Sequence, residues 1–254
     1  MLFLVESLGD RVWAGQGVAA NEFPWHVAIF RKIGDDFECV CGGSIVRKEV
    51  VLSVFDSPDR AMSSSGVPNV FFHSHFVRNY QDDIAIVHLT RAFTFTAKVR
   101  AVCLDLVDRD LYTRQTSPGN VGKVAGWGFT ESLRPSLNLN SLNVPVVGPA
   151  ECIEGFPPSF TSFITSDKIC AGLSNGTAVC PGDSGGGLVF PQQNTSTSPP
   201  RWFLYAILSN APTSRDLSIP CLINVLALYT NVFKHQFWLS TNLDDVQPRE
   251  GTYT

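Results

Sequence analysis

The octapeptide Cys180-Pro-Gly-Asp-Ser-Gly-Gly-Gly187 is the stretch of this sequence that decides its fold and its chemistry. A serine flanked by glycines can present its hydroxyl on a tight turn, and the backbone N–H groups of Gly182 and Ser184 can then converge on one oxygen. For Gly-x-Ser-x-Gly alone, an ordinary glycine-rich turn is the alternative interpretation. The longer pattern Gly182-Asp-Ser-Gly-Gly186 is much more specific.

Short apolar segments on both sides of this octapeptide predict a mostly β protein. The segments are punctuated by 20 Gly and 16 Pro in 254 residues. An entry strand is expected over residues 21–30, and a hairpin over residues 41–46 and 50–53. Further strands are expected over residues 70–76, 84–89, 122–127, 187–190, 202–208 and 226–231. Apolar residues three and four apart predict a terminal helix over residues 232–239.

Composition excludes several classes of protein. A chain that is 44% hydrophobic and 17% charged suits one large all-β domain or two small lobes that share a core, and it does not suit a disordered protein. With 19 Lys and Arg against 23 Asp and Glu, and no basic tract, we expect no nucleic-acid partner. The apolar runs are far shorter than a bilayer requires, so we expect no membrane partner.

Cysteine usage favours disulfides over a metal site. The chain has seven cysteines and no Cys-x-x-Cys pattern, so we expect no metal and no cofactor. Disulfides and the glycosylation sequons at Asn175 and Asn194 indicate an extracellular protein. The segment Met1-Leu-Phe-Leu-Val5 is followed by Glu6 and lacks the features of a signal peptide. We therefore expect the chain to lack its true N-terminus.

Six further motifs stand in the same order as in a known family. They are Phe23-Pro-Trp-His-Val27, Cys41-Gly-Gly-Ser44, Asp83-Ile-Ala-Ile-Val-His-Leu89, Ala125-Gly-Trp-Gly128, Lys168-Ile-Cys-Ala-Gly172 and Leu228-Tyr-Thr-Asn-Val232. With the serine motif, they make residues 11–239 resemble the trypsin/chymotrypsin-type (S1) serine proteases. The resemblance implies a chymotrypsin-like double β-barrel with a C-terminal helix. The entry strand is similar to those of arthropod clotting or immune proteases.

The resemblance also divides the chain and implies site residues. Residues 1–11 are expected to be an N-terminal activation segment, residues 12–243 the two-lobed protease domain, and residues 244–254 a tail. Ser184 matches the nucleophile, with Gly182 and Ser184 supplying the oxyanion hole. Asp83 matches the buried aspartate that orients the catalytic histidine, and Ser209 aligns with the serine that hydrogen-bonds that aspartate.

The histidine of the triad is absent. In the family an Ala-Ala-His-Cys tetrapeptide ends the strand, whereas here residues 51–54 run directly into Phe55-Asp-Ser-Pro58. Only residues 54–69 separate this strand from the next, so a block has been lost and the first barrel is expected to be shortened. The cysteine that Cys41 would bridge in the family is lost with it. Without a base, a serine hydroxyl is a weak nucleophile at neutral pH.

The histidines that are present do not fit the role of the base. They are His26 in the entry strand, His88 in the strand after Asp83, His235 on the terminal helix, and His73 and His75, which stand where the family commonly has a non-catalytic His-Pro pair. A base must reach both Ser184 and Asp83. We therefore expect catalytic incompetence.

Activation is also implied by the resemblance. Arg11 aligns with the zymogen cleavage site, and the new amine of Val12 would insert beside Asp183. An uncleaved basic linker is the alternative, because Trp13 and Ala14 depart from the family pattern. Cys103 matches the cysteine that ties the domain to an upstream chain.

Specificity and disulfide pairing follow from the same resemblance. The specificity pocket is implied to include Ala178, Ser209, Ala211 and Ala227, so it would be small and apolar and would lack a counter-ion for Lys or Arg. Two family disulfides are implied, Cys152–Cys170 and Cys180–Cys221. The resemblance assigns no such pair to Cys39, Cys41 or Cys103.

Three hypotheses about function remain open. The chain is a secreted protease homologue that binds protein partners in an extracellular proteolytic cascade without cutting them. Alternatively, it is an active endopeptidase whose histidine segment is missing from this sequence through exon skipping or a gene-model gap. The third hypothesis is a misfolded fragment that lost part of a barrel.

Overall fold

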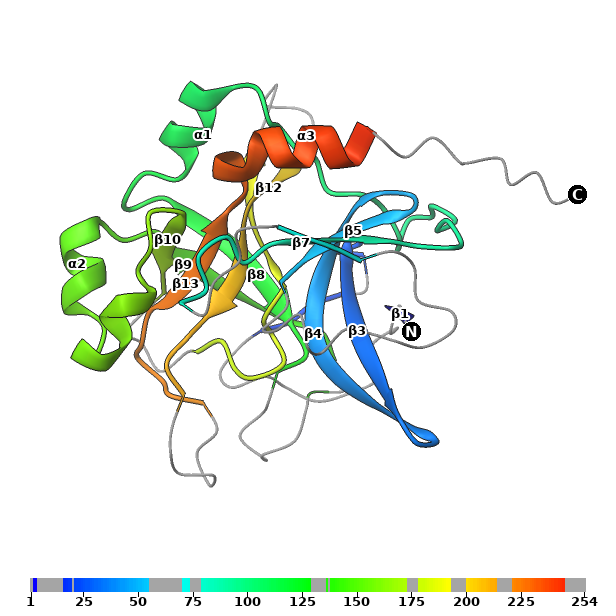
Figure 1. Ribbon diagram of the computed structural model, residues 1–254, viewed down its shortest axis with the longest axis horizontal. Coiled ribbons are helices and arrows are strands. Elements are labelled where there is room, and N and C mark those ends of the chain that lie inside the picture. The colour runs from blue at the N-terminus through cyan, green and yellow to red at the C-terminus, as the bar shows by residue number, and fades with distance from the viewer. Residues whose placement is uncertain are drawn as a thin grey trace, which may run out of the picture.

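The computed structural model describes residues 2–3, 16–19, 21–54, 70–73, 79–128, 136, 138–172, 178–192, 200–213 and 221–244. In this part of the chain, most strands belong to two antiparallel sheets, and short helices lie at their margins (Figure 1). Arg11, Val12, His75, Asn175 and Asn194, about which the sequence makes predictions, lie outside the described residues.

The first sheet is built around a long hairpin. Its strands, in spatial order, are β1 (Leu2–Phe3), β3 (His26–Ile33), β4 (Asp36–Arg47), β5 (Val50–Ser53), β7 (Ala85–His88) and β6 (Val70–Phe72). The β3–β4 hairpin projects beyond the rest of the sheet (Figure 1). Within the described residues, the sheet ends at β1 on one side and at β6 on the other. This open sheet agrees with the expected shortened barrel.

The second sheet has seven strands and closes on itself. The order is β10 (Lys168–Ala171), β13 (Ala227–Asn231), β12 (Arg201–Asn210), β11 (Gly187–Gln192), β8 (Val121–Gly126), β9 (Asn140–Pro145) and β2 (Gln16–Gly17). An antiparallel bridge joins Val146, just after β9, to Ala171 of β10. The N–H of Val147 also donates to the Cys170 carbonyl at 3.0 Å. The two ends of the sheet therefore meet, as in a barrel.

Helices are few and short in the described residues. They are α1 (Arg109–Gln115), α2 (Pro149–Glu154), the 3₁₀ segments η2 (Pro158–Phe163) and η3 (Val232–His235), and α3 (Gln236–Asp244). The predicted terminal helix is thus a 3₁₀ turn that continues as α3. The side chain of Asn231 caps the turn by accepting from the N–H of Lys234 at 3.0 Å. No helix among the described residues is long and apolar enough to cross a membrane.

A shared hydrophobic core holds the two sheets together. Fully buried side chains of the first sheet, such as Ile45 and Leu52, belong to the same cluster as Val189 and Ile207 of the second sheet. Burying such aliphatic side chains stabilises the fold by about 1.5–3 kcal/mol each. A second cluster fills the closed barrel. The chymotrypsin-like double-barrel architecture predicted from the sequence is thus confirmed.

Candidate active site

Ser184 lies on a turn that is anchored to both lobes. Its carbonyl accepts from the N–H of Gly42 in β4 at 2.6 Å, and the N–H of Gly185 donates to the Leu208 carbonyl of β12 at 2.8 Å. Gly185 has a φ of +86°, a conformation that L side chains rarely adopt. A Cβ there would lie 2.3 Å from the Gly42 carbonyl oxygen. The glycine pattern therefore permits the close approach of the turn to β4.

Two backbone N–H groups of the serine turn are unused in the described part of the chain. Within the described residues, the N–H groups of Gly182 and Ser184 donate to no protein acceptor. These are the donors that the sequence assigns to the oxyanion hole. Unused N–H groups of this kind can stabilise the oxygen of a ligand's carbonyl group.

Asp83 is placed on the opposite lobe and is almost fully buried, with 1% of its surface exposed. The hydroxyl of Ser209, near the end of β12, donates to Oδ2 of Asp83 at 2.6 Å. A hydrogen bond to a charged group stabilises the charged form. The structure therefore contains the Ser209–Asp83 hydrogen bond that the resemblance implies.

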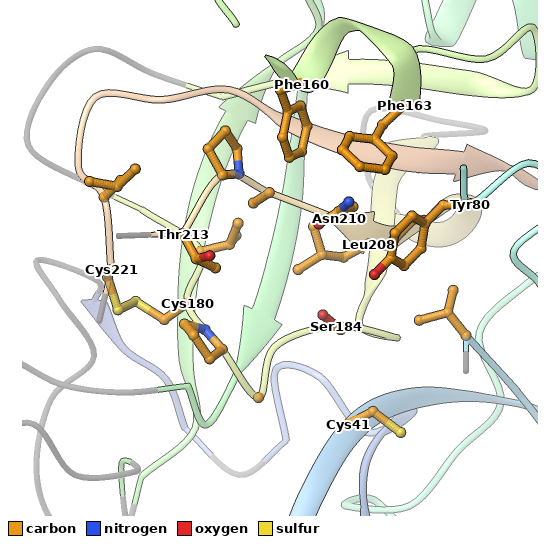
Figure 2. A pocket seen from close by; sticks show the side chains of 18 of the residues that line it. Cys41, Tyr80, Phe160, Phe163, Cys180, Ser184, Leu208, Asn210, Thr213 and Cys221 are labelled. Atoms are coloured by element: carbon orange, nitrogen blue, oxygen red, sulfur yellow. A yellow bond between two sulfur atoms is a disulfide. The ribbon is translucent and has the colours of Figure 1, made fainter. Parts of the chain in front are cut away.

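A cavity of about 660 Å³ opens in front of Ser184. Ser184 lies in the middle of the cavity, with Tyr80 on one side and the Cys180–Cys221 disulfide on the other (Figure 2). Val54, the last described residue before residue 70, also lines it. No histidine belongs to the lining among the described residues.

The described histidines occupy other places. His26 stacks on Trp127 with ring centroids 4.9 Å apart, and its burial lowers its pKa to about 3, so the ring is neutral near pH 7. His88 belongs to β7. His73 and His235 face each other at 5.2 Å between centroids, beside Asp82 rather than in the cavity.

Aromatic side chains form a wall of the cavity that the sequence reasoning missed. The ring of Phe163 contacts Tyr80 at 5.5 Å and Phe160 at 5.0 Å between centroids. Figure 2 shows Phe160, Phe163 and Tyr80 around one end of the cavity. The two phenylalanines stand three residues apart in η2. Residues i and i+3 lie on one face of a 3₁₀ turn, so this spacing was the signal in the sequence for a shared aromatic face.

The predicted specificity residues are divided between the cavity and the core. Ser209 and Ala211 line the cavity. Ala178 is instead buried against Cys180 and Cys221, and Ala227 is buried in the core of the second barrel. A single pocket formed by all four residues stays a prediction.

Both predicted disulfides are present. Cys152 is bonded to Cys170, and Cys180 to Cys221. Neither includes Cys39, Cys41 or Cys103. Burial raises the pKa of the Cys39 thiol to about 11, which keeps this thiol protonated near pH 7.

Asp183, beside the serine, is a buried carboxyl group. Its Oδ1 accepts from the N–H of Gly128 at 2.7 Å and its Oδ2 from the N–H of Cys180 at 2.8 Å. Burial outweighs these two hydrogen bonds and raises the pKa of Asp183 to about 6. A new amine at Val12 would supply the missing positive charge; this insertion stays a prediction, because Arg11 and Val12 lie outside the described residues.

Comparisons with known proteins agree with this geometry. The family model described as Trypsin matches residues 12–233. CLIP domain-containing serine protease B4 of Anopheles gambiae is 25% identical, over 93% of this chain and 71% of that protein. Phenoloxidase-activating factor 1 of Holotrichia diomphalia is 25% identical, over 92% of this chain and 70% of that protein. Limulus clotting factor C of Carcinoscorpius rotundicauda is also 25% identical, over 78% of this chain but only 22% of that protein.

Proposed function

This chain belongs to the trypsin family of serine proteases, and we propose on that premise that it is a secreted, non-catalytic protease homologue. In this proposal it binds protein components of an extracellular proteolytic cascade without cutting them. The fold, the turn that carries Ser184, and Asp83 are retained, but the histidine that would accept the proton of the serine is lost.

The observation that carries the proposal is the cavity at Ser184. Asp83 is held in place by Ser209, yet no imidazole lines the cavity in the described part of the chain. Loss of the base in a comparable triad costs on the order of 10⁶ in turnover, or about 8 kcal/mol of activation barrier. The remaining oxyanion-hole donors can still bind a carbonyl oxygen, but they cannot activate the hydroxyl.

The chemistry of the cavity supports binding of an apolar segment of a partner. Its aromatic wall of Tyr80, Phe160 and Phe163 can pack against an apolar side chain. Arg31 is the one charged residue among the described lining residues. Without an acidic group, the cavity offers no counter-ion to a basic side chain.

The cascade role is supported by the names of the relatives. One is a phenoloxidase-activating factor and another is a clotting factor. A homologue of such proteins that cannot cut could still bind a cascade protease or its substrate. The two disulfides suit an extracellular location.

Hydrolysis of a peptide library tests this function. The protein is cleaved after Arg11 and incubated with peptides that carry small apolar, aromatic or basic residues at the scissile position. We expect rates equal to those of the Ser184→Ala variant for every peptide. Turnover above that control, at any of these residues, would contradict the proposal.

Sequencing of the transcript tests the active-endopeptidase alternative. We expect the messenger RNA to encode Leu52 to Asp59 as they stand here. An Ala-Ala-His-Cys tetrapeptide encoded in the genomic DNA between Ser53 and Phe55 would favour an active endopeptidase instead.

A further inference from the structure

A cluster of two imidazoles and a carboxylate lies outside the cavity. His73 directly follows β6, Asp82 precedes β7, and His235 ends η3. The first two residues come from the first lobe, and the third comes from the segment that leads from β13 into α3. The fold thus joins residues that are 162 positions apart in the chain, counted from His73 to His235.

The three side chains are spaced like ligands around one ion. Nδ1 of His73 lies 3.8 Å from Oδ2 of Asp82, and Nδ1 of His235 lies 3.8 Å from Oδ1 of Asp82. One ligand atom from each residue lies within 4.8 Å of the others. Tetrahedral zinc with bonds of about 2.0–2.2 Å places its ligand atoms roughly 3.3–3.6 Å apart, somewhat closer than the groups lie here without an ion. At 3.8 Å the groups are too distant for direct hydrogen bonds.

The second ring nitrogen of His235 is an independent observation that points to a metal site. Its Nε2 lies 3.7 Å from Oδ2 of Asp167, and only 3% of the side chain is exposed. This distance is beyond the limit of a direct hydrogen bond, but Asp167 is a carboxylate toward which the buried nitrogen faces. A histidine that binds a metal through one nitrogen almost always directs the other N–H to a carboxylate or another acceptor. The two nitrogens of His235 are oriented in this way, with Nδ1 toward the cluster and Nε2 toward Asp167.

Asp167 is fixed in place by its own contacts. Lys168 Nζ lies 2.6 Å from its Oδ2. The backbone N–H of Asp82 donates to the same oxygen at 3.0 Å. Lys168 therefore balances the charge of Asp167, and the carboxylate of Asp82 remains the anionic group that faces both imidazoles.

Asp82 adopts an unusual backbone conformation. Its φ is +55°, in the left-handed region that few residues other than Gly, Asn and Asp adopt. Such conformations gather at functional sites, where the surrounding structure holds the residue in place. Here the conformation accompanies a carboxylate that lies between His73 and His235.

We propose that His73, Asp82 and His235 bind one divalent transition-metal ion, with zinc as the ion that best suits two imidazoles and a carboxylate. Three protein ligands leave the fourth tetrahedral position to water. The bound ion ties the segment between β6 and β7 to the C-terminal segment of the second lobe. This site differs from the expectation of no metal, which rested on cysteine spacing, because the two histidines stand far apart in the sequence.

Metal titration of the whole chain tests the site. The protein, with both disulfides intact, is treated with chelator and dialysed against ZnCl₂ or CoCl₂. We expect one ion per chain and a cobalt spectrum without a thiolate charge-transfer band. Asp82→Asn and His73→Gln should each weaken binding at least tenfold, and Asp167→Asn should weaken it about 10–100-fold. His88→Gln, which alters a histidine of β7 outside the cluster, is the matched control and should bind as the wild type does.

Asp82→Asn is the decisive variant, because Asn tolerates a positive φ and keeps nearly the same shape. Its far-UV circular dichroism should match that of the wild type. Zinc should raise the unfolding temperature of the wild type and leave that of Asp82→Asn unchanged. The proposal is overturned if the wild type binds no stoichiometric ion, if Asp82→Asn and His73→Gln bind as tightly as the wild type, or if cobalt shows thiolate ligation.

Discussion

Ser184 and its neighbours separate two tasks that a protease combines. The turn supplies unused N–H donors, and Asp83 keeps its hydrogen bond from Ser209. The N–H donors can bind a carbonyl oxygen, and Asp83 can orient an imidazole. The transfer of a proton from the hydroxyl requires a base within hydrogen-bond reach, and the described lining of the cavity contains no histidine.

The buried carboxyl of Asp183 predicts a pH-dependent stability for the uncleaved chain. Its pKa is raised from 3.8 to about 6 by burial, so between these values the native state holds a proton that the unfolded chain has released. The free energy of unfolding must then fall as the pH rises through this range. The shift corresponds to about 3 kcal/mol.

Urea unfolding at pH 4 and pH 7 measures this loss. Asp183→Asn is the reference, because it cannot titrate at this position. We expect the wild type to lose about 2–3 kcal/mol more than the variant between the two pH values. Equal losses in the two proteins would mean that Asp183 is already paired with a positive charge.

The close approach of Gly185 to β4 predicts a large cost for a single methyl group. Gly185 and Gly119 have similar φ values, +86° and +90°, but a Cβ at Gly119 would meet nothing within 4 Å. Gly119→Ala should therefore cost only the backbone strain, about 1–2 kcal/mol. Gly185→Ala should cost about 1–3 kcal/mol more, because the methyl group would overlap the Gly42 carbonyl and the Ser53 hydroxyl.

Chemical denaturation of the two glycine variants gives the comparison. If both lose the same free energy of unfolding, the serine turn does not pack against β4 as described.

Site residues could be predicted from the sequence where they belong to a recognisable motif. Ser184 and Asp83 stand in short, specific motifs. Ser184 lines the cavity, and Asp83 accepts a hydrogen bond from Ser209, which also lines it. Tyr80 and Phe163 stand in no such motif, and they meet only through the packing of η2 against the segment before β7. Ala227 belongs to the core cluster of the second barrel, and its assignment to the pocket stays a prediction.

At the scale of elements, strands and helices were predicted where their apolar residues show a clear periodic pattern. Apolar patterns located nine strands to within about five residues, for example β12 (Arg201–Asn210) against the expected 202–208. No strand was expected over β1, β2, β9 or β10. Helix α1 was missed because its seven residues contain one buried side chain, Tyr112, and its start depends on the Asp108 cap. So short a helix leaves no amphipathic stripe in the sequence.

The disulfide Cys180–Cys221 is expected to stabilise the segment that carries Ser184. It closes a loop with a sequence separation of 41, for which chain entropy gives about 4 kcal/mol at most. Replacing both cysteines by Ala should lower the free energy of unfolding by about 2–4 kcal/mol in a urea titration. Cys103→Ala, outside both disulfides, is the control and should change it by less than about 1 kcal/mol. A loss no greater than that of Cys103→Ala would contradict a structural role for this disulfide.

At the scale of the whole molecule, the two lobes differ in closure. The second sheet meets itself through Val146 and Ala171. The first sheet, within the described residues, ends at β1 and β6. Strands at an open edge lack ladder partners on one side, so the first lobe should open at a lower free energy than the second.

Native-state hydrogen exchange tests this difference between the lobes. We expect amides of β4 and β5 to exchange at least tenfold faster than those of β8 and β12. Equal protection would mean that residues outside the described part complete the first barrel, and it would also exclude a damaged fragment.

Reaction with a fluorophosphonate probe tests the central claim most directly, because the probe labels a serine only when a base activates its hydroxyl. The protein is cleaved after Arg11, incubated with the probe, and compared with Ser184→Ala by intact mass. Our account predicts labelling no greater than that of the variant. Stoichiometric labelling of Ser184 would contradict it, and would indicate that a residue outside the described part, with His75 as the first candidate, serves as the base.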